Sequence, residues 1–327
     1  MTLPRLAVVV PSLGDEAKLV RLLEALSRQS LPRECFQILV VLDGADASPA
    51  VRARSAALEA RLIRLERRAG PGAARNRGAL EARAEFLAFT EDDVAPAPDW
   101  LERAAARLEG EPSIDVLEGD TCEPGGRPIR RRSGDQALYL PTNLFVRRAL
   151  FERVGGYCAD FFDSENGVYF REDSDLGFRL EEAGARVARE PRAMVTHPRE
   201  HTRFLDPLRW ARRYEMDPLL ESRHPLLFRE RIEAYRWGPF VVRRPIVRAS
   251  MAYIVAAGLA VLAWVVRSVS AAALLLGIAG AVLVFIWAKW RFDPVRLPLL
   301  PFVPVALIVA VMRGGRRARR IRVGSRR

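Results

Sequence analysis

Three consecutive acidic residues, Glu91, Asp92 and Asp93, directly follow a short apolar run at residues 86–89. Carboxylates this close together repel one another unless a positive charge lies among them. Carboxylate oxygens are also the ligands that Mg²⁺ and Mn²⁺ prefer, and substrate phosphates often complete the coordination of these ions. The segment therefore predicts a site for a divalent cation, with a solvated acidic turn as the alternative.

A second acidic pair, Glu172 and Asp173, lies at the start of a predicted helix at residues 171–182, and Gly184 follows as its stop. A positioned carboxylate can take the proton of an attacking hydroxyl group. The pair is therefore a candidate general base for a transfer reaction.

Two further segments carry polar groups that suit a nucleotide. Asp43 follows the apolar run at residues 36–42, where it is placed to hold a base or a ribose. Arg75 and Asn76 lie at the beginning of a helix after the turn at residues 70–72. Positive charge and the dipole at a helix start both favour a phosphate group.

Apolar runs and helical patterns alternate through the first half of the chain. Strands are predicted at residues 6–10, 36–42, 62–65 and 85–90, with helices between them. This alternation is typical of a parallel sheet with helices on both faces. Ligands of such sheets bind beyond the carboxyl ends of the strands, which is where the polar groups described above are expected. Later strands are predicted at residues 115–121 and in two short pieces near residues 187 and 193–196.

The net charge of +12 comes from the C-terminal part of the chain. From Arg248 onward there are 13 basic residues and one acid, whereas residues 1–247 carry 39 of each. A neutral N-terminal part argues against nucleic-acid binding. The three cysteines show no CxxC spacing and predict neither a disulfide framework nor a zinc site.

Two uncharged runs, residues 249–266 and 269–288, are each long enough to cross a hydrocarbon core of roughly 30 Å. Only two residues separate them, which predicts a tight transmembrane hairpin. A third run, residues 297–312, contains three prolines and is expected to be re-entrant or a third span. The final 15 residues hold eight arginines and no acid, so the positive-inside rule places this tail in the cytosol. An even number of spans then keeps the N-terminal body in the cytoplasm too, on an inner membrane.

Residues 206–248 interleave aromatic residues with arginines, which favours amphipathic helices at a membrane interface over an ordinary surface helix pair. We therefore expect a globular domain at 1–205, interfacial helices at 206–248, a membrane region at 249–312 and an arginine-rich tail at 313–327.

The ordered segments VVVPS, VLDGAD, GPGAARNRG, FTEDDV, PTNLFVRR, GGY and REDSDLGFRL resemble the inverting family-2 glycosyltransferases of GT-A fold, over about residues 5–200. The resemblance implies a mostly parallel α/β sheet flanked by helices, with a Rossmann-like nucleotide-binding half and an acceptor half. It also implies transfer of a sugar from a UDP- or GDP-sugar, with inversion, assisted by Mg²⁺ or Mn²⁺.

The resemblance assigns roles to single residues as well. The donor-binding residues would be Pro11, Ser12, Asp43, Arg75, Asn76 and Asp92. The metal site would comprise Asp93, Glu91 and His197, with Glu91, in place of the usual aspartate, set back from the ion. Asp173 would be the catalytic base, with Glu172 beside it.

Acceptor contacts are expected from Thr142, Asn143, Arg209 and Trp210, and acceptor selectivity from a loop at residues 123–134. The segment DPLRW resembles part of the Q-x-x-R-W motif of processive synthases, but Asp206 replaces the glutamine. This departure argues against processive polymerisation.

These observations predict a membrane-anchored glycosyltransferase that acts on a lipid-linked or glycan acceptor in envelope polysaccharide or glycolipid synthesis. Two alternatives remain open at this point: a nucleotidyltransferase on a similar nucleotide-binding sheet, and a non-catalytic membrane scaffold with a degenerate domain.

Overall fold

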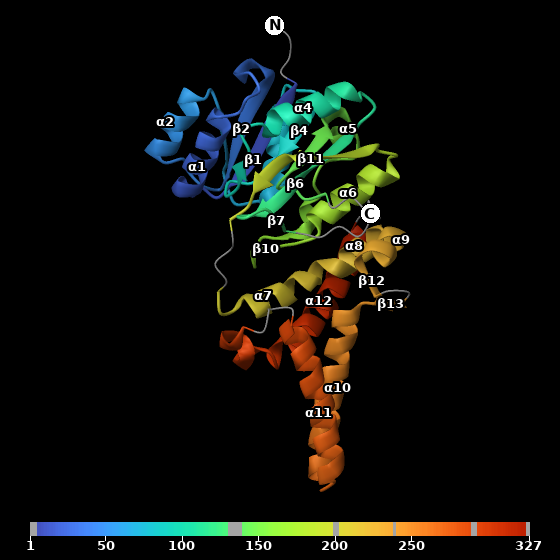
Figure 1. Ribbon diagram of the computed structural model, residues 1–327. Helices are drawn as coiled ribbons and strands as arrows, with labels where there is room; N and C mark the ends of the chain where they lie inside the picture. Colours follow the sequence, from blue (N-terminus) through green and yellow to red (C-terminus); the bar gives the residue numbers. More distant parts are fainter. Residues whose placement is uncertain (1–4, 130–138, 199–202, 238–239, 289–292, 325–327) are drawn as a thin grey trace. The chain divides into compact units, whose positions relative to one another are not determined.

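The computed structural model describes residues 5–129, 139–198, 203–237, 240–288 and 293–324. The chain divides into two compact units, Met1–Glu200 and His201–Arg327. The first unit holds the sheet and the second holds the long apolar helices (Figure 1). The division lies close to the border expected between residues 205 and 206.

The first unit is built on a nine-stranded sheet with the strand order β3-β2-β1-β4-β8-β6-β11-β5, and β7 pairs with β6. Its strands are β1 (Leu6–Ser12), β2 (Phe36–Asp43), β3 (Arg61–Leu65), β4 (Phe86–Phe89), β5 (Ala95–Pro96), β6 (Val116–Glu123), β7 (Arg127–Pro128), β8 (Leu144–Arg147) and β11 (Val187–Thr196). The sheet is parallel from β3 to β4, but β8 runs antiparallel to both of its neighbours. The fold is thus the expected α/β sheet flanked by helices, in which β5, β7 and β8 run against the direction of the other strands.

Helices cover both faces of this sheet. They are α1 (Glu16–Ser27), α2 (Pro49–Ala57), α3 (Pro71–Glu81), α4 (Trp100–Gly110), α5 (Arg148–Arg153) and α6 (Glu172–Glu182). One apolar cluster contains residues of α1 and α4, and another contains residues of α3, α5 and α6. Successive residues of β1 alternate between the two clusters, which explains why this strand reads as a continuous apolar run.

Two local differences from the predicted elements affect the site. The two short strands expected near residues 187 and 193–196 form one strand, β11, with a register shift between Glu190 and Met194. A small hairpin of β9 (Phe162–Asp163) and β10 (Val168–Tyr169) precedes α6. Of the loop expected at residues 123–134, β7 pairs back onto β6, and residues 130–134 lie outside the described residues.

The second unit begins with α7 (Asp206–Arg213), η3 (Tyr214–Met216), α8 (Asp217–Arg223), α9 (Pro225–Leu227) and η4 (Phe228–Ile232). The helices expected over residues 206–248 are therefore short and end at Ile232. An antiparallel hairpin follows, formed by β12 (Ala234–Trp237) and β13 (Phe240–Arg243). Alternating aromatic and charged residues do not distinguish a short hairpin from a helix turn, so the sequence did not reveal it.

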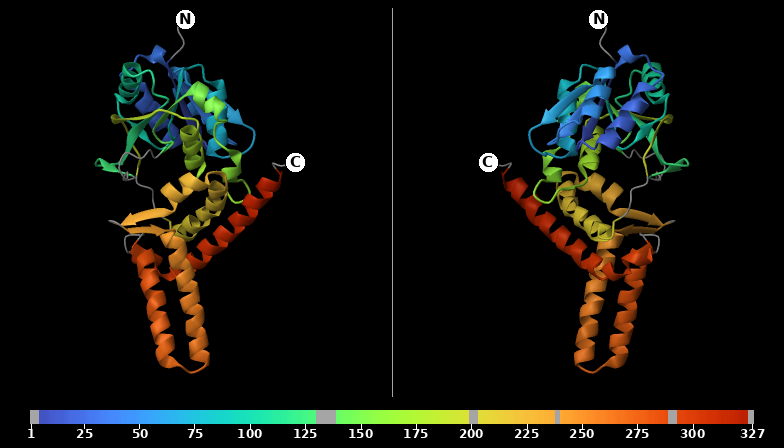
Figure 2. Two further views of the ribbon diagram at one scale, coloured as in Figure 1. Left: turned by 90° about the vertical axis from the view of Figure 1, so that its right-hand side faces the viewer. Right: turned by 90° about the vertical axis from the view of Figure 1, so that its left-hand side faces the viewer.

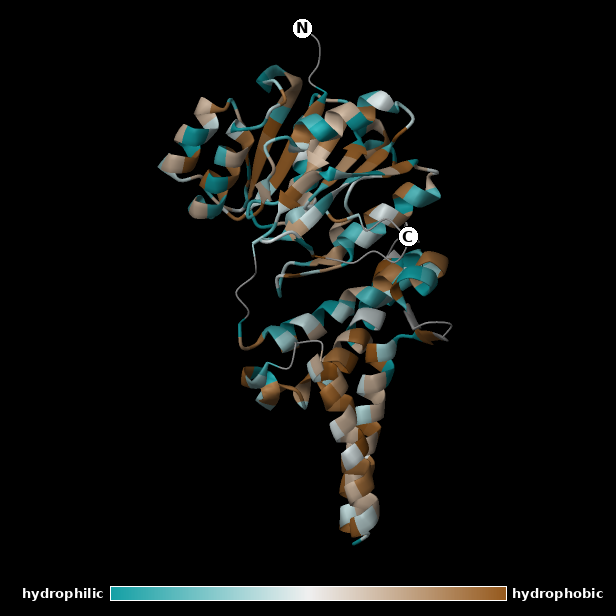
Figure 3. Ribbon diagram, in the orientation of Figure 1, coloured by the Kyte–Doolittle hydropathy of each residue, from teal (hydrophilic) through white to brown (hydrophobic). Residues whose placement is uncertain are grey.

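Two long helices, α10 (Pro245–Val265) and α11 (Val269–Ala288), lie side by side as the expected hairpin (Figure 2). Both are strongly apolar along their length (Figure 3). Only 22% of the most apolar window of α10 and 17% of that of α11 is buried within the protein. A core helix of a soluble protein would be mostly buried, so these two helices are candidates for membrane spans.

The third apolar run takes a different form from the one expected. It begins in η5 (Pro294–Leu299) and continues into α12 (Phe302–Gly324). That helix extends through most of the arginine-rich segment without a break at residue 312. Residues of α7, α11 and α12, together with Leu300 just after η5, form a small apolar core in this unit.

Candidate active site

Four strands of the first unit direct polar residues to the same edge of the sheet. Strands β1, β2 and β4 are mutually parallel, and β4 and β6 are both antiparallel to β8. Since β11 is parallel to β6, it points the same way as β1 and β4. The polar residues at these carboxyl ends are Ser12 of β1, Asp43 of β2, residues 91–93 after β4 and His197 after β11. Strand direction therefore brings the late histidine to the acidic segment.

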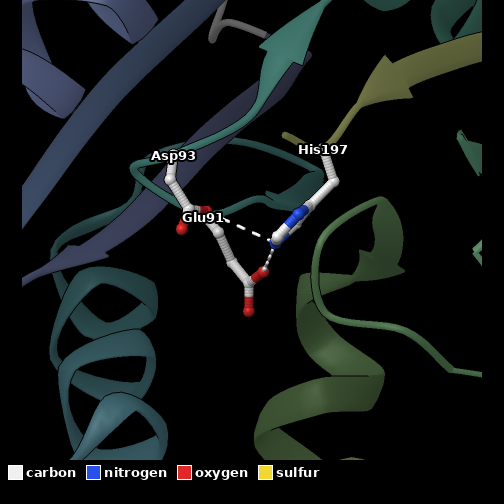
Figure 4. A group of neighbouring side chains, drawn as sticks. All are labelled: Glu91, Asp93 and His197. Atoms are coloured by element: carbon white, nitrogen blue, oxygen red, sulfur yellow. Dashed lines mark ion pairs between the residues drawn. The ribbon is translucent and has the colours of Figure 1, made fainter. Parts of the chain in front are cut away.

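Glu91, Asp93 and His197 form a compact group, in which one ligand atom of each residue lies within 4.8 Å of the others. His197 Nε2 is 3.8 Å from Glu91 Oε2 and 3.6 Å from Asp93 Oδ1. All three residues are half-buried. Figure 4 shows the side chains converging from the loop after β4 and from the end of β11.

Local contacts orient the imidazole of His197. Its Nδ1 lies 2.7 Å from the backbone oxygen of Pro198. A carbonyl oxygen only accepts, so this contact uses a proton on Nδ1, and Nε2 is the ring nitrogen that faces the two acids. Two carboxylate oxygens and one imidazole nitrogen are a donor set that fits a divalent cation. The residues present therefore suit the metal that the sequence predicted.

Glu91 is a full member of this group rather than set back from it. Its Oε1 accepts a hydrogen bond from Arg75 Nη2 at 3.2 Å, which leaves Oε2 facing His197. Burial raises the pKa of Glu91, Arg75 opposes this shift, and Asp93 adds to it. The longer glutamate side chain spans the distance between the arginine and the histidine, which accounts for a glutamate at this position.

Asp92 has a different partner from its two neighbours. Its Oδ2 accepts from Ser12 Oγ at 2.5 Å, and Ser12 Oγ in turn accepts from the backbone nitrogen of Gly14 at 3.0 Å. Burial raises the pKa of Asp92, and the Ser12 hydrogen bond partly offsets this. The contact ties the acidic loop to the end of β1, where the sequence places the donor.

Lys18 is a site residue that sequence reasoning missed. It lies in the first turn of α1, and its Nζ is 3.2 Å from Asp93 Oδ2. Partial burial lowers the pKa of Lys18, but Asp93 and other nearby acids outweigh this, so the net shift is upward. No motif marks a lysine at this position; only the direction of α1, which starts just beyond β1, could have indicated it.

Arg75 is buried within the protein and contacts one glutamate of each acidic segment. The residue is 2% exposed, and its Nη1 donates to Glu172 Oε1 at 3.0 Å while its Nη2 contacts Glu91. Its guanidinium also stacks over the ring of Tyr157, 5.3 Å from the centroid. Arg75 was predicted to bind the donor, but both of its terminal nitrogens bond to carboxylates of the protein. Its geometry is that of a residue that positions two acids.

The two residues of the second acidic pair, at the start of α6, differ in burial and in their hydrogen-bond partners. Glu172 is buried, and this burial raises its pKa to about 7, against the lowering effect of Arg75. Asp173 is half-buried and its Oδ1 accepts from the backbone nitrogen of Ser174 at 2.7 Å and from its hydroxyl at 3.3 Å. Asp173 therefore has an oriented carboxylate with no contact to Arg75 among the described residues.

Asp43 and Asn76 support turns around the site. The two carboxylate oxygens of Asp43 accept from the backbone nitrogens of Ala69 at 2.6 Å and Gly70 at 2.9 Å. Asn76 bonds to both the backbone nitrogen and the backbone oxygen of Tyr157, each at 2.8 Å. Both residues hold loops at the strand ends, so any contact with a donor would come in addition to these bonds. Pro11, also predicted to bind the donor, is buried in β1 opposite Val41 of β2.

Of the two acceptor candidates in the first unit, Asn143 is engaged inside the fold. Its Oδ1 accepts from Trp100 Nε1 at 2.8 Å, and its Nδ2 donates to the backbone oxygens of Asp120 and Ala193. Thr142 is half-buried, with its hydroxyl 3.2 Å from that of Thr121 at the end of β6. Thr142 is therefore the better placed of the two for a ligand contact.

The other two acceptor candidates, Arg209 and Trp210, lie in α7 of the second unit. Arg209 Nη1 is 3.6 Å from Asp206 Oδ1. The ring of Trp210 makes an edge contact with Tyr214, and the residue packs against the apolar core of this unit. The structure thus shows both residues in local contacts, and their role in acceptor binding stays a prediction.

Comparison with known proteins shows which family this chain resembles. The model of glycosyl transferase family 2 matches residues 7–174. Glycosyltransferase AglE of Haloferax volcanii is 26% identical over 196 residues, which is 55% of this chain and 64% of AglE. The pre-mycofactocin glycosyltransferase of Mycobacterium tuberculosis is 31% identical over 147 residues, which is 39% of this chain and 30% of that protein. The chain thus covers less than two thirds of the length of these curated relatives.

Solved structures share the fold at low sequence identity. Mannosyltransferase PcManGT of Pyrobaculum calidifontis, in complex with GDP-Man and Mn²⁺, has a TM-score of 0.62 at 19% identity and covers 95% of this chain and 88% of its own. Residues 1–349 of TarS of S. aureus have a TM-score of 0.56 at 17% identity, with coverages of 97% and 91%. At these identities the likeness concerns the fold.

Proposed function

Because the chain belongs to glycosyl transferase family 2, we propose that it transfers a sugar from a nucleoside diphosphate sugar to an acceptor hydroxyl group, with inversion at the anomeric carbon. Membership of this family argues against the nucleotidyltransferase, and the presence of both acidic pairs argues against the non-catalytic scaffold. The donor class accords with the fold neighbours, whose structures are complexes with GDP-Man, UDP or UDP-GlcNAc.

The observation that carries the proposal is the group of Glu91, Asp93 and His197 at the carboxyl ends of the strands. These residues would hold Mg²⁺ or Mn²⁺, which when bound neutralises the charge that builds on a departing diphosphate. Ser12, Asp92 and Asp43 lie at neighbouring strand ends, and we assign them to the nucleoside side of the donor.

Asp173 is the proposed base. The acceptor oxygen bonds to the anomeric carbon from the face opposite the diphosphate while the bond from that carbon to the phosphate oxygen breaks. The acceptor proton passes to Asp173, and the electron pair of the broken bond leaves with the nucleoside diphosphate. Ser174 donates to Asp173 Oδ1 and leaves Oδ2 for this proton. Single displacement of this kind inverts the anomeric carbon, and positioning supplies much of the rate.

The acceptor is proposed to be lipid-linked or close to a membrane, as in envelope polysaccharide or glycolipid synthesis. Support comes from α10 and α11, which are long, apolar and mostly exposed. The arginines of α12 favour a cytoplasmic catalytic unit on an inner membrane, by the preference of basic segments for the cytosolic side.

The test is release of nucleoside diphosphate by the full chain in detergent, measured over a panel of nucleotide sugars with Mn²⁺ or Mg²⁺. We expect turnover with one donor class, its loss with EDTA, and a decrease of roughly 100- to 1000-fold in Asp93→Asn. Asp46→Asn is the matched control, because the Asp46 side chain is 71% exposed and, among the described residues, its ion pair is with the exposed Arg64. Activity that survives both EDTA and Asp93→Asn would refute the metal-dependent mechanism.

A further inference from the structure

A basic cavity in the second unit lies next to the start of the first long apolar helix. Its volume is about 570 Å³, and it is lined from α9, η4, the β12–β13 hairpin and α10. The charged lining residues are Arg229, Arg243, Arg248 and Glu230. Three cations against one anion leave an excess of positive charge around one opening.

The three arginines of this cavity have no side-chain partner among the described residues. Within the described part of the chain, none of Arg229, Arg243 and Arg248 makes a side-chain hydrogen bond or an ion pair, and all three are exposed. A guanidinium group carries five donors, and it suits phosphate because two of them can bind one phosphate at once. The cavity thus presents guanidinium hydrogen-bond donors to a ligand that carries acceptor groups such as phosphate oxygens.

The neighbouring Arg244 shows that unpaired arginines are not general in this segment. Its Nε pairs with Glu233, its Nη2 is 2.6 Å from Glu221 Oε1, and its guanidinium stacks over Phe228. Arg244 therefore joins the hairpin to η4 and α8. The arginines on either side of it in sequence, Arg243 and Arg248, are left for another role.

The position of the cavity along α10 indicates the kind of ligand. Arg248 is the last charged residue before the uncharged run at 249–266. If α10 spans a membrane, this residue lies at the boundary between hydrocarbon and water, which is the depth of lipid phosphates. The lining also includes Leu226, 75% exposed, and Val241, 46% exposed, which offer apolar surface beside the charges.

We infer that this cavity binds the headgroup of an anionic phospholipid, with Arg229, Arg243 and Arg248 on the phosphate and the apolar lining against the glycerol and the first acyl carbons. Glu230 accepts from a hydroxyl group of the headgroup, as a glycerol headgroup provides. The inference rests on the proposed function only through the membrane placement of α10. It adds a lipid site in the second unit, formed by residues outside the proposed catalytic group.

The test measures binding of short-chain, soluble dihexanoyl-phosphatidylglycerol to the full chain in neutral detergent, by native mass spectrometry. Dihexanoyl-phosphatidylcholine and inorganic phosphate are titrated in parallel. We expect saturable binding of phosphatidylglycerol only. The triple variant R229Q/R243Q/R248Q should bind it about 100-fold more weakly, since each basic residue near a membrane surface contributes about fivefold.

The matched control is R313Q/R319Q/R320Q, which removes the same charge from exposed positions of α12 and should bind phosphatidylglycerol within about twofold of the parent. R229K/R243K/R248K keeps the charge and should stay within about tenfold, which separates charge from loss of folding. The inference is wrong if phosphatidylcholine or inorganic phosphate binds as tightly as phosphatidylglycerol, or if both glutamine variants lose binding equally.

Donor hydrolysis by the same preparations keeps this inference apart from the proposed function. A cavity variant that loses the lipid but hydrolyses the nucleotide sugar at the parent rate supports a separate lipid site. A parent protein that hydrolyses the donor but binds no anionic lipid overturns the lipid site alone. Lipid binding without any donor turnover overturns the proposed function alone.

Discussion

The acidic segment after β4 and the acidic pair at the start of α6 both place one glutamate against Arg75. Glu91 contacts its Nη2 and Glu172 its Nη1. The neighbouring aspartates, Asp93 and Asp173, have no contact with this arginine among the described residues. In each region the glutamate contacts this buried arginine, and the aspartate does not.

The two regions differ in how far this arrangement is buried. The Glu91 side chain is 30% exposed and has a second partner in His197, whereas that of Glu172 is 7% exposed and has its raised pKa near 7. One arginine thus contacts both a half-exposed group that fits a divalent cation and the buried neighbour of the proposed base. Substitutions in the two regions should therefore impair different properties of the protein, such as metal binding, reaction rate and stability.

The largest effect is expected from Asp173→Asn, which removes the proposed base and keeps the shape of the side chain. Transfer to the acceptor should slow by roughly 100- to 10,000-fold, the usual contribution of a general base. Donor affinity should stay within a fewfold, because Asp173 is not assigned to the donor. A rate of transfer within tenfold of the parent would exclude Asp173 as the base and refute its proposed difference in role from Glu172.

Arg75→Met tests the shared cation. It leaves Glu172 buried without its partner, and removal of one member of a buried ion pair costs about 3–5 kcal/mol. We expect a corresponding fall in the free energy of unfolding, measured by denaturant titration of the full chain in detergent.

Arg77→Met is the matched control for this change, because Arg77 lies on the same helix in an exposed pair with Glu81. Exposed pairs contribute less than about 1 kcal/mol. If the two variants unfold at the same denaturant concentration, Arg75 does not stabilise the site as described.

The raised pKa of Glu172 predicts a pH dependence of stability. Its pKa is about 7 in the folded protein and 4.5 for an unperturbed side chain. The folded state therefore holds a proton that the unfolded state has released between these values, so this group lowers the stability as pH rises from about 4.5 to 7. Glu172→Gln should remove that part of the slope when unfolding temperatures are compared from pH 5 to pH 8. An unchanged slope would mean that Glu172 is ionised throughout this range.

The smallest effect is expected from Lys18→Met, which changes only the surroundings of the Glu91, Asp93 and His197 group. Lys18 is paired with Asp93 but its side chain is 38% exposed, so the interaction is screened. Removal of a cation beside the metal group should tighten Mn²⁺ binding about two- to fivefold, as measured by calorimetry. Lys18→Arg should leave Mn²⁺ affinity within twofold of the parent, and weaker binding in the methionine variant would show that Lys18 supports the group.

Much of the first unit could be predicted because its signals are local. The apolar runs of β1, β2 and β4 mark strands buried on both faces, and the polar residues that follow them mark the strand ends. The antiparallel β8 could not be predicted, since a strand of four residues gives no indication of its direction. Likewise, a register shift makes β11 one strand where the pattern predicted two.

The sequence by itself determined that this chain has an α/β nucleotide-binding type of sheet, acids at its strand ends and two helices long enough for a membrane. Only the tertiary structure decided which side chains meet. Arg75 and Glu172 are 97 positions apart, and His197 joins Glu91 across more than half of the first unit. Burial and long-range charge pairing leave no local pattern, so the contacts of Arg75 with Glu91 and Glu172 became visible only in three dimensions.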